Sequence, residues 1–159
     1  MRRIITASLL MAVMLSGHAS AYELPDVAGE WHSVSENVVP LVGSCRAVYR
    51  TYTREAPKGT LEVILTEGAG PGSLYVPDSV NDAEGMMPTD AGFKLLTVSG
   101  HKAIVERQSF MPLVLAIDAG DNITLTIESS SLNENELSEF AEVILSSWNA
   151  TESGSSPAQ

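Results

Sequence analysis

The chain has 159 residues, enough for one ordinary domain. It carries 20 Asp and Glu against 9 Lys and Arg, a formal net charge of -11. Because binding phosphates requires a basic face, this composition excludes nucleic acid as an expected partner. The hydrophobic content of 44% is typical of a globular chain and too high for general disorder.

The first 21 residues have the features of a cleaved export signal. Arg2 and Arg3 precede an apolar run at 4–14 that is too short to span a bilayer, and small residues end the segment at Ala21. Its removal leaves a chain that begins at Tyr22, with seven cations against 20 anions. Tyr22, not a cysteine, directly follows the cleavage site, so we expect no lipid anchor. We also expect no transmembrane segment in the mature chain. The sequence predicts a periplasmic or secreted acidic protein.

Residues 22–43 lack a sustained pattern, because prolines and glycines interrupt them. Within them we expect an edge strand at 31–34 and a brief turn or helix at 38–42. Cys45 follows as the only cysteine, so no disulfide can form within the chain. It heads an apolar stretch, which favours a buried small side chain over a reactive thiol or a metal ligand.

A first β-hairpin is predicted from two runs of alternating residues. Residues 45–54 and 61–66 alternate with period two, and Pro57-Lys58-Gly59 supplies a turn between them. Arg46, Arg50, Arg54 and Lys58 fall close together here, and Arg50 and Arg54 share a strand face. We interpret that face as the solvated side of the sheet, neutralised by Glu55, Glu62 and their neighbours. The alternative is a small patch that contacts an anion through Arg50 and Arg54.

The segment from Gly68 to Gly92 has no predicted element and is longer than most structureless loops in compact domains. Its apolar side chains either pack back onto the sheet or form an adaptable contact surface of the kind that methionine suits. These side chains are Leu74, Tyr75, Val76, Met86 and Met87.

A second hairpin and two further strands follow the loop. Residues 93–98 and 103–107 flank a turn in which Gly100 can adopt a positive φ, and strands are predicted at 113–117 and 123–128. Successive strands with such short links are expected to be antiparallel.

In the last predicted element the apolar residues repeat with the period of an α-helix. Its apolar stripe has the spacing of one helix face, with Asn133 as N-cap and Glu136 reaching back to it. At about 1.5–3 kcal/mol each, the four large members of the stripe offer roughly 6–12 kcal/mol on burial. We therefore expect the helix to dock on the sheet, with a flexible tail at 151–159. The stripe consists of Leu137, Phe140, Ala141, Ile144 and Trp148.

Together these elements predict one α+β domain over residues 22–150. Its expected architecture is an antiparallel β-meander of five or six strands with the C-terminal amphipathic helix packed on one face. No internal repeat and no second domain is expected.

The sequence contains only weak signatures of metal binding or catalysis. His32, His101 and Cys45, together with Met86, Met87 and Met111, are soft ligands suited to copper, but none has a diagnostic spacing. A small secreted hydrolase would need His32 or His101, and no nucleophile-elbow motif accompanies either. We name no catalytic residue and expect no cofactor.

These observations favour an exported, non-enzymatic accessory or binding protein that presents the 68–92 loop and a sheet face to a partner protein or an apolar ligand. A periplasmic copper-type protein using Cys45 and a small hydrolase are the alternatives.

Overall fold

The computed structural model describes residues 22–43, 45–68, 76–81 and 92–153. The predicted export signal lies outside this range, as do residues 154–159 of the predicted tail. Residues 151–153 belong to the C-terminal helix, which therefore continues past the predicted domain end at 150.

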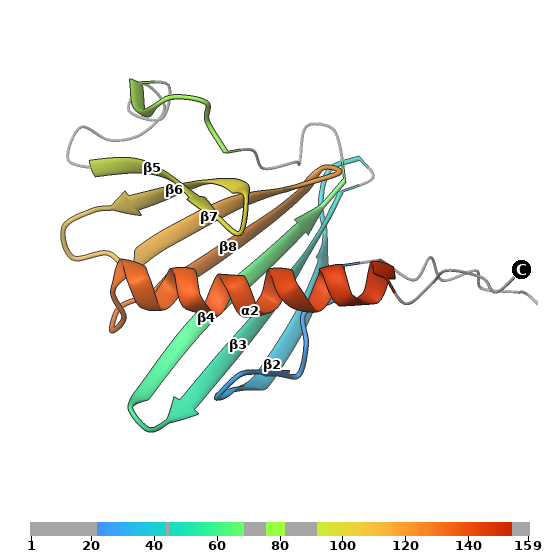
Figure 1. Cartoon of the computed structure of the whole chain (residues 1–159), viewed down its shortest axis with the longest axis vertical. Helices are drawn as coiled ribbons and strands as arrows, with labels where there is room; N and C mark the ends of the chain where they lie inside the picture. The colour runs from blue at the N-terminus through green and yellow to red at the C-terminus, as the bar shows by residue number, and fades with distance from the viewer. Residues whose placement is uncertain (1–21, 44, 69–75, 82–91, 154–159) are drawn as a thin grey trace, which may run out of the picture.

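The α+β class is confirmed, but the described residues form one antiparallel sheet of eight strands, not five or six. The spatial order is β1-β2-β3-β4-β8-β7-β6-β5, so β4 and β8 pair at the centre and β2 and β5 lie toward opposite edges (Figure 1). The sheet is thus two four-stranded meanders joined through β4 and β8. The strands are β1 Val27–Ala28, β2 Trp31–Pro40, β3 Arg46–Glu55, β4 Lys58–Glu67, β5 Gly92–Val98, β6 His101–Arg107, β7 Leu113–Gly120 and β8 Ile123–Ser129.

The expectation of an irregular region at 22–43 was wrong for residues 31–40, whereas residues 22–26 and 41–43 belong to no helix or strand. One continuous strand, β2, replaces the predicted short strand and turn, and it pairs with β3 from His32 opposite Thr53 to Pro40 opposite Arg46. A register shift between Ser33 and Ser35 interrupts the alternation of side chains, as a β-bulge does. The strand therefore has no clean period in the sequence.

The hairpin turns follow local backbone preferences. Ser99 and Gly100 both have positive φ, at 48° and 84°, which is the type I′ pattern expected of a two-residue hairpin. The first hairpin turns one residue earlier than predicted, at Ala56 and Pro57, so Lys58 and Gly59 already belong to β4.

The C-terminal helix α2, Glu134–Ser153, begins as predicted. The Asn133 Oδ1 accepts hydrogen bonds from the backbone N–H groups of Asn135 and Glu136, at 3.0 and 3.2 Å. The Glu136 carboxylate accepts one in return from the Asn133 N–H at 3.1 Å. This reciprocal capping box satisfies amides that the first helical turn leaves without partners.

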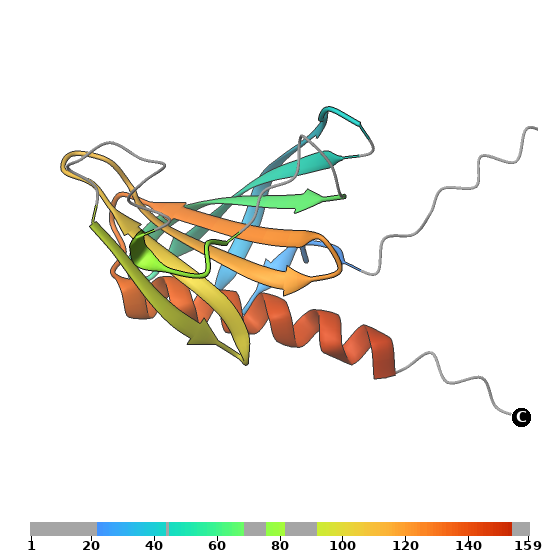
Figure 2. The same ribbon diagram turned by 90° about the horizontal axis from the view of Figure 1, so that it is seen from above.

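The helix forms a second layer against one face of the sheet (Figure 2). All five members of its apolar stripe are buried. Phe140 lies at the centre, edge-on to the rings of Tyr52 on β3 and Trp31 on β2, with centroid distances of 5.2 and 5.8 Å. The predicted docking of the helix on one sheet face is therefore confirmed.

A smaller cluster lies on the opposite face of the sheet. Val76 packs on Ile104 of β6 and is only 2% exposed, with Phe93, Leu95 and Ala116 around the pair. Nearby, Lys102 forms an ion pair with Asp78 at 2.7 Å. Both contacts hold the described end of the loop against the sheet.

Within the described residues, no helix combines the length and apolar character that crossing a membrane requires.

Candidate functional site

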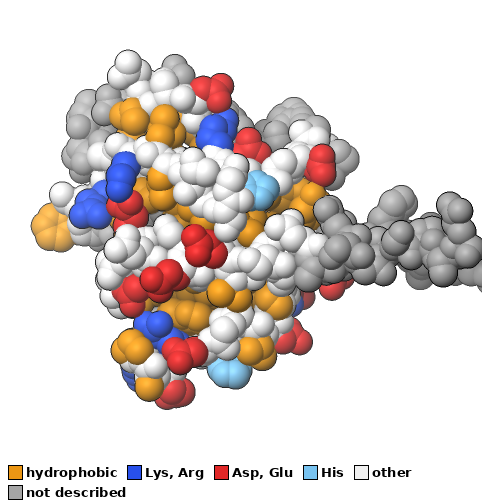
Figure 3. All heavy atoms as spheres, viewed as in Figure 1, with side chains coloured by type: hydrophobic (Ala, Val, Ile, Leu, Met, Phe, Trp, Pro, Cys, Tyr) orange, Lys and Arg blue, Asp and Glu red, His pale blue; other side chains and the backbone are white. Residues whose placement is uncertain are grey.

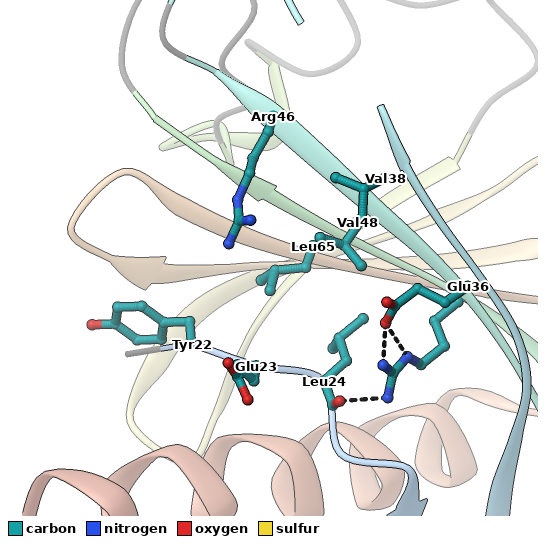
Figure 4. A pocket seen from close by; sticks show the side chains of 9 residues that line it. Tyr22, Glu23, Leu24, Glu36, Val38, Arg46, Val48 and Leu65 are labelled. Atoms are coloured by element: carbon teal, nitrogen blue, oxygen red, sulfur yellow. Dashed lines mark hydrogen bonds and ion pairs between the residues drawn. The ribbon is translucent and has the colours of Figure 1, made fainter. Parts of the chain in front are cut away.

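One cavity lies where the N-terminal segment 22–24 passes between α2 and strands β2, β3 and β4 (Figure 4). Its volume is about 260 Å³, smaller than a typical pocket for a drug-sized ligand at roughly 300–1,000 Å³. We call it the N-terminal pocket. It is lined by Tyr22, Glu23, Leu24, Glu36, Val38, Arg46, Val48, Arg50 and Leu65.

One wall of the pocket is held in place by the C-terminal helix. The Trp148 indole N–H donates to the backbone carbonyl of Glu23 at 2.6 Å. The Tyr22 ring packs edge-on against Trp148 with a centroid distance of 5.3 Å, and its hydroxyl donates to Asp121 at 3.0 Å. The segment thus has a fixed position relative to the sheet, although it belongs to no strand or helix.

Arg50 ties the same segment to β2 and β3. Its guanidinium donates to the Leu24 carbonyl at 2.5 Å, pairs with Asp26 at 3.1 Å and binds the Glu36 carboxylate through two nitrogens. Burial lowers the pKa of Arg50, but its hydrogen bonds to Glu36 and Tyr52 more than compensate, so the pKa lies above its ordinary value. All three guanidinium nitrogens of Arg50 are engaged, and the residue acts as a structural tie.

Arg46 differs from Arg50 because part of its guanidinium has no partner among the described residues. Its Nε pairs with Glu67 of β4, while within the described residues neither Nη has a hydrogen-bond partner. The side chain is 43% exposed and reaches toward segment 22–24, where the Glu23 side chain lies (Figure 4). The hydrogen bond to Glu67 raises the pKa of Arg46, and the nearby negative charge of Glu23 raises it further.

Four apolar side chains complete the lining, although most of the surface that the pocket exposes is polar. Leu24, Val48 and Leu65 are buried core residues whose edges form the floor, and Val38 on β2 is 51% exposed at the side. A guanidinium and a carboxylate above an apolar floor can bind a small molecule that has both charged and apolar parts.

Arg54 is also structural. Its guanidinium lies 4.6 Å from the ring centroid of Trp31, and it donates to the Pro57 carbonyl at 2.9 Å and to Glu136 of α2 at 3.3 Å. Such a cation–π contact contributes roughly 0.5–2 kcal/mol. Arg54 therefore links the helix N-terminus to the sheet.

The assignment of Arg50 and Arg54 to the solvated side of the sheet was wrong. Tyr52 lies between them in β3 and is completely buried, so this face of the strand is the one that the helix covers. Both arginine side chains are mostly buried, and Asp26, Glu36 and Glu136 neutralise them in place of Glu55 and Glu62. Long cationic stems can cover apolar surface while the charged end finds a partner at the rim of the core.

Of the predicted loop contacts, only Val76 lies in the described residues. It is buried against the sheet, which is the packing alternative for this segment rather than an open contact surface. Leu74, Tyr75, Met86 and Met87 lie outside the described residues.

The proposed metal ligands are not brought together. Cys45 is buried before β3, His32 is exposed at the start of β2, and His101 begins β6 in the other half of the sheet. Among the described residues no three His, Cys, Asp or Glu side chains are grouped to hold a metal ion. Met111 is exposed beyond β6, and Met86 and Met87 lie outside the described range.

The two histidines do not have the geometry that the hydrolase alternative requires of a catalytic base. In the part of the chain that the structure describes, neither His32 nor His101 has a hydrogen bond or ion pair to a carboxylate or hydroxyl that would orient it as a base.

A row of carboxylates on the face away from the helix was not anticipated from the sequence. Glu62 on β4 pairs directly with Glu128 on β8. Burial raises the pKa of Glu128, and the charge of Glu62 raises it further. Burial likewise raises the pKa of Glu106 on β6, with a contribution from Glu128. Repulsion between these carboxylates and their burial destabilise the fold at neutral pH.

Comparison with protein-family models gave no match, and neither did searches of curated proteins and of solved structures. The N-terminal pocket and its chemistry are therefore the basis for a functional argument.

Proposed function

We propose that this chain is an exported, non-enzymatic binding protein that holds a small ligand in the N-terminal pocket. The observation that carries the proposal is Arg46, whose two Nη atoms face a cavity with an apolar floor. A charged donor group beside an apolar surface is typical of ligand sites, where a few polar groups orient a molecule held mainly by apolar contact.

The fixed position of the wall supports this proposal. Segment 22–24 is anchored by Trp148, Arg50 and Asp121. A site that is already formed before binding loses less conformational entropy when the ligand arrives. The described lining contains no histidine, serine or cysteine, so it offers groups for binding more readily than groups for acyl transfer or proton relay.

Export is part of the proposal. Residue 22 is both the first residue after the expected cleavage site and the start of the anchored segment. Cleavage after Ala21 would leave the complete pocket wall in the mature protein. Expression of the full chain in a bacterial host, followed by fractionation and N-terminal sequencing, should give a periplasmic product that begins at Tyr22. An uncleaved product in the cytosol would refute export.

The 68–92 loop is proposed as a second contact surface, for a partner protein. Val76 and Asp78 anchor its described part to β6. We expect the double substitution Met86→Ser and Met87→Ser to abolish co-purification of the partner and leave the unfolding midpoint unchanged. Retention of every co-purifying protein by this variant would refute the loop proposal.

The pocket is tested by thermal-shift screening of the purified mature protein against a library of small metabolites. Val38→Lys places a charge in the pocket, and Val34→Lys is the matched control because Val34 is 61% exposed on the same strand but does not line the cavity. Ligands that raise the melting temperature of the wild type and of Val34→Lys, but not of Val38→Lys, would support the proposal. A library without such ligands, or ligands indifferent to Val38→Lys, would refute it.

A further inference from the structure

Two opposite charges share the N-terminal pocket without closing into an ion pair. Within the described residues, Arg46 makes its only ion pair with Glu67, and the Glu23 carboxylate has no ion pair. The Glu23 main chain is held by Trp148, so the carboxylate is kept near the pocket while its oxygens remain available. Glu23 nevertheless contributes to the raised pKa of Arg46, which places the two charges within electrostatic range of each other.

The other charged pair in the lining is already complete. Arg50 binds Glu36 through two nitrogens and uses its remaining donors on Leu24 and Asp26. A ligand would have to break these bonds to reach Arg50. Among the described side chains that line the pocket, the charged groups open to a ligand are therefore one guanidinium edge, on Arg46, and one carboxylate, on Glu23.

This combination disfavours a ligand with a single charge. A simple anion at Arg46 would face the carboxylates of Glu23 and Glu67, and a simple cation at Glu23 would face the guanidinium. The whole chain has a net charge of -11, and Asp and Glu side chains are spread over the helix-covered face (Figure 3). The overall field therefore repels anions as they approach. A molecule that carries both charges satisfies both groups.

We propose that the ligand of the N-terminal pocket is a free α-amino acid with an apolar side chain. The inference rests on the proposed binding function. The ligand carboxylate accepts hydrogen bonds from the Arg46 Nη atoms, its ammonium group donates to the Glu23 carboxylate, and its side chain lies against Val38, Val48 and Leu65. The volume of about 260 Å³ accommodates a molecule of this size and is small for a longer peptide.

Isothermal titration calorimetry of the mature protein with L-leucine tests the inference. Arg46→Gln and Glu23→Gln each remove one charge-assisted contact, and each should weaken leucine binding roughly 10- to 100-fold. Glu30→Gln is the matched control, because Glu30 is an exposed carboxylate outside the cavity, and it should bind leucine like the wild type. Glu23→Gln retains the backbone carbonyl that Trp148 uses, so its melting temperature should stay close to that of the wild type.

Modified ligands test the ammonium group and the carboxylate of leucine one at a time. N-acetyl-leucine lacks the ammonium group and leucine amide lacks the carboxylate, so each should bind roughly 10- to 100-fold more weakly than leucine. The dipeptide leucyl-leucine distinguishes a free amino acid from a peptide end, and we expect leucine to bind more tightly. Tighter binding of the dipeptide, or equal binding of leucine by the wild type and Glu23→Gln, would overturn the inference.

The failure of this inference can be told apart from failure of the proposed function. If N-acetyl-leucine or a fatty acid binds in a way that depends on Val38 and Arg46 but not on Glu23, the pocket is a ligand site and the ligand is not zwitterionic. If no library compound binds in a way that depends on Val38, the binding function itself is refuted.

Discussion

Replacing Phe140 by alanine should remove the central contact between the helix and the sheet. The side chain is 2% exposed and packs edge-on against Trp31 and Tyr52. Truncation of a buried phenylalanine costs about 3–5 kcal/mol, including about 0.5–1.5 kcal/mol for each aromatic pair. This is a large part of the 5–15 kcal/mol that stabilises a typical domain.

Urea unfolding followed by tryptophan fluorescence measures this loss, because Trp31 and Trp148 are both buried at the interface. With an m-value of about 2 kcal/mol/M, the midpoint of Phe140→Ala should fall by about 2 M. Phe140→Leu is the matched control, since it keeps most of the apolar volume and loses only the two ring contacts, at about 1–3 kcal/mol. A midpoint shift below about 0.5 M for alanine, or the same shift for both variants, would contradict the packing described here.

Three further changes test other parts of the structure. Gly59→Ala should lower the free energy of unfolding by about 1–3 kcal/mol, because the added Cβ would lie 2.9 Å from Cη2 of Trp31; an unchanged urea midpoint would contradict this packing. Trp148→Phe should lower it by about 1 kcal/mol through loss of the hydrogen bond to the Glu23 carbonyl, a loss measurable by urea unfolding followed by far-ultraviolet circular dichroism. Glu128→Gln should raise the free energy of unfolding at pH 7, because the folded pKa of Glu128 lies above its unfolded value and the native state binds the proton more tightly. As the pH falls through the folded pKa of Glu128, protonation should remove the difference in free energy of unfolding between the wild type and Glu128→Gln. The wild type should be fully stabilised by this proton below the unfolded pKa of about 4.3, so the urea midpoints of the two proteins should converge between pH 7 and pH 4.

The sequence located the arginines near the candidate site but not the site itself. The arginines in residues 46–54 were interpreted as a solvated face, with an anion patch at Arg50 and Arg54 as the alternative; in the structure Arg46 and Arg50 line the same pocket, and Arg54 does not. The sequence did not show which arginine keeps guanidinium nitrogens without a partner among the described residues, because that depends on groups such as Leu24 and Glu36 that are distant in the chain. The sequence did not predict the pocket wall at residues 22–24, because a segment of three residues is too short to show a hydrophobic period.

The face of β3 was misassigned for a related reason. Alternation correctly placed Arg50, Tyr52 and Arg54 on one side, but alternation alone does not say which side meets the helix. Arginines were taken to indicate solvent, whereas the buried Tyr52 between them was the better indicator. A polar side chain on the core side is stable only with partners, and Glu136 and Asp26 supply them from elsewhere in the chain.

The amino-acid sequence alone determined the antiparallel strands from β3 onward, the positive-φ turn at Gly100 and the capped helix that starts after Asn133, because periodicity, turn preference and capping act between residues close in the chain. The pairing of β4 with β8, the length of β2 and the pocket were decided only by the tertiary structure. These features depend on contacts between residues that are far apart in the chain. Their stability comes from burial of a shared core, which no local pattern of residues records.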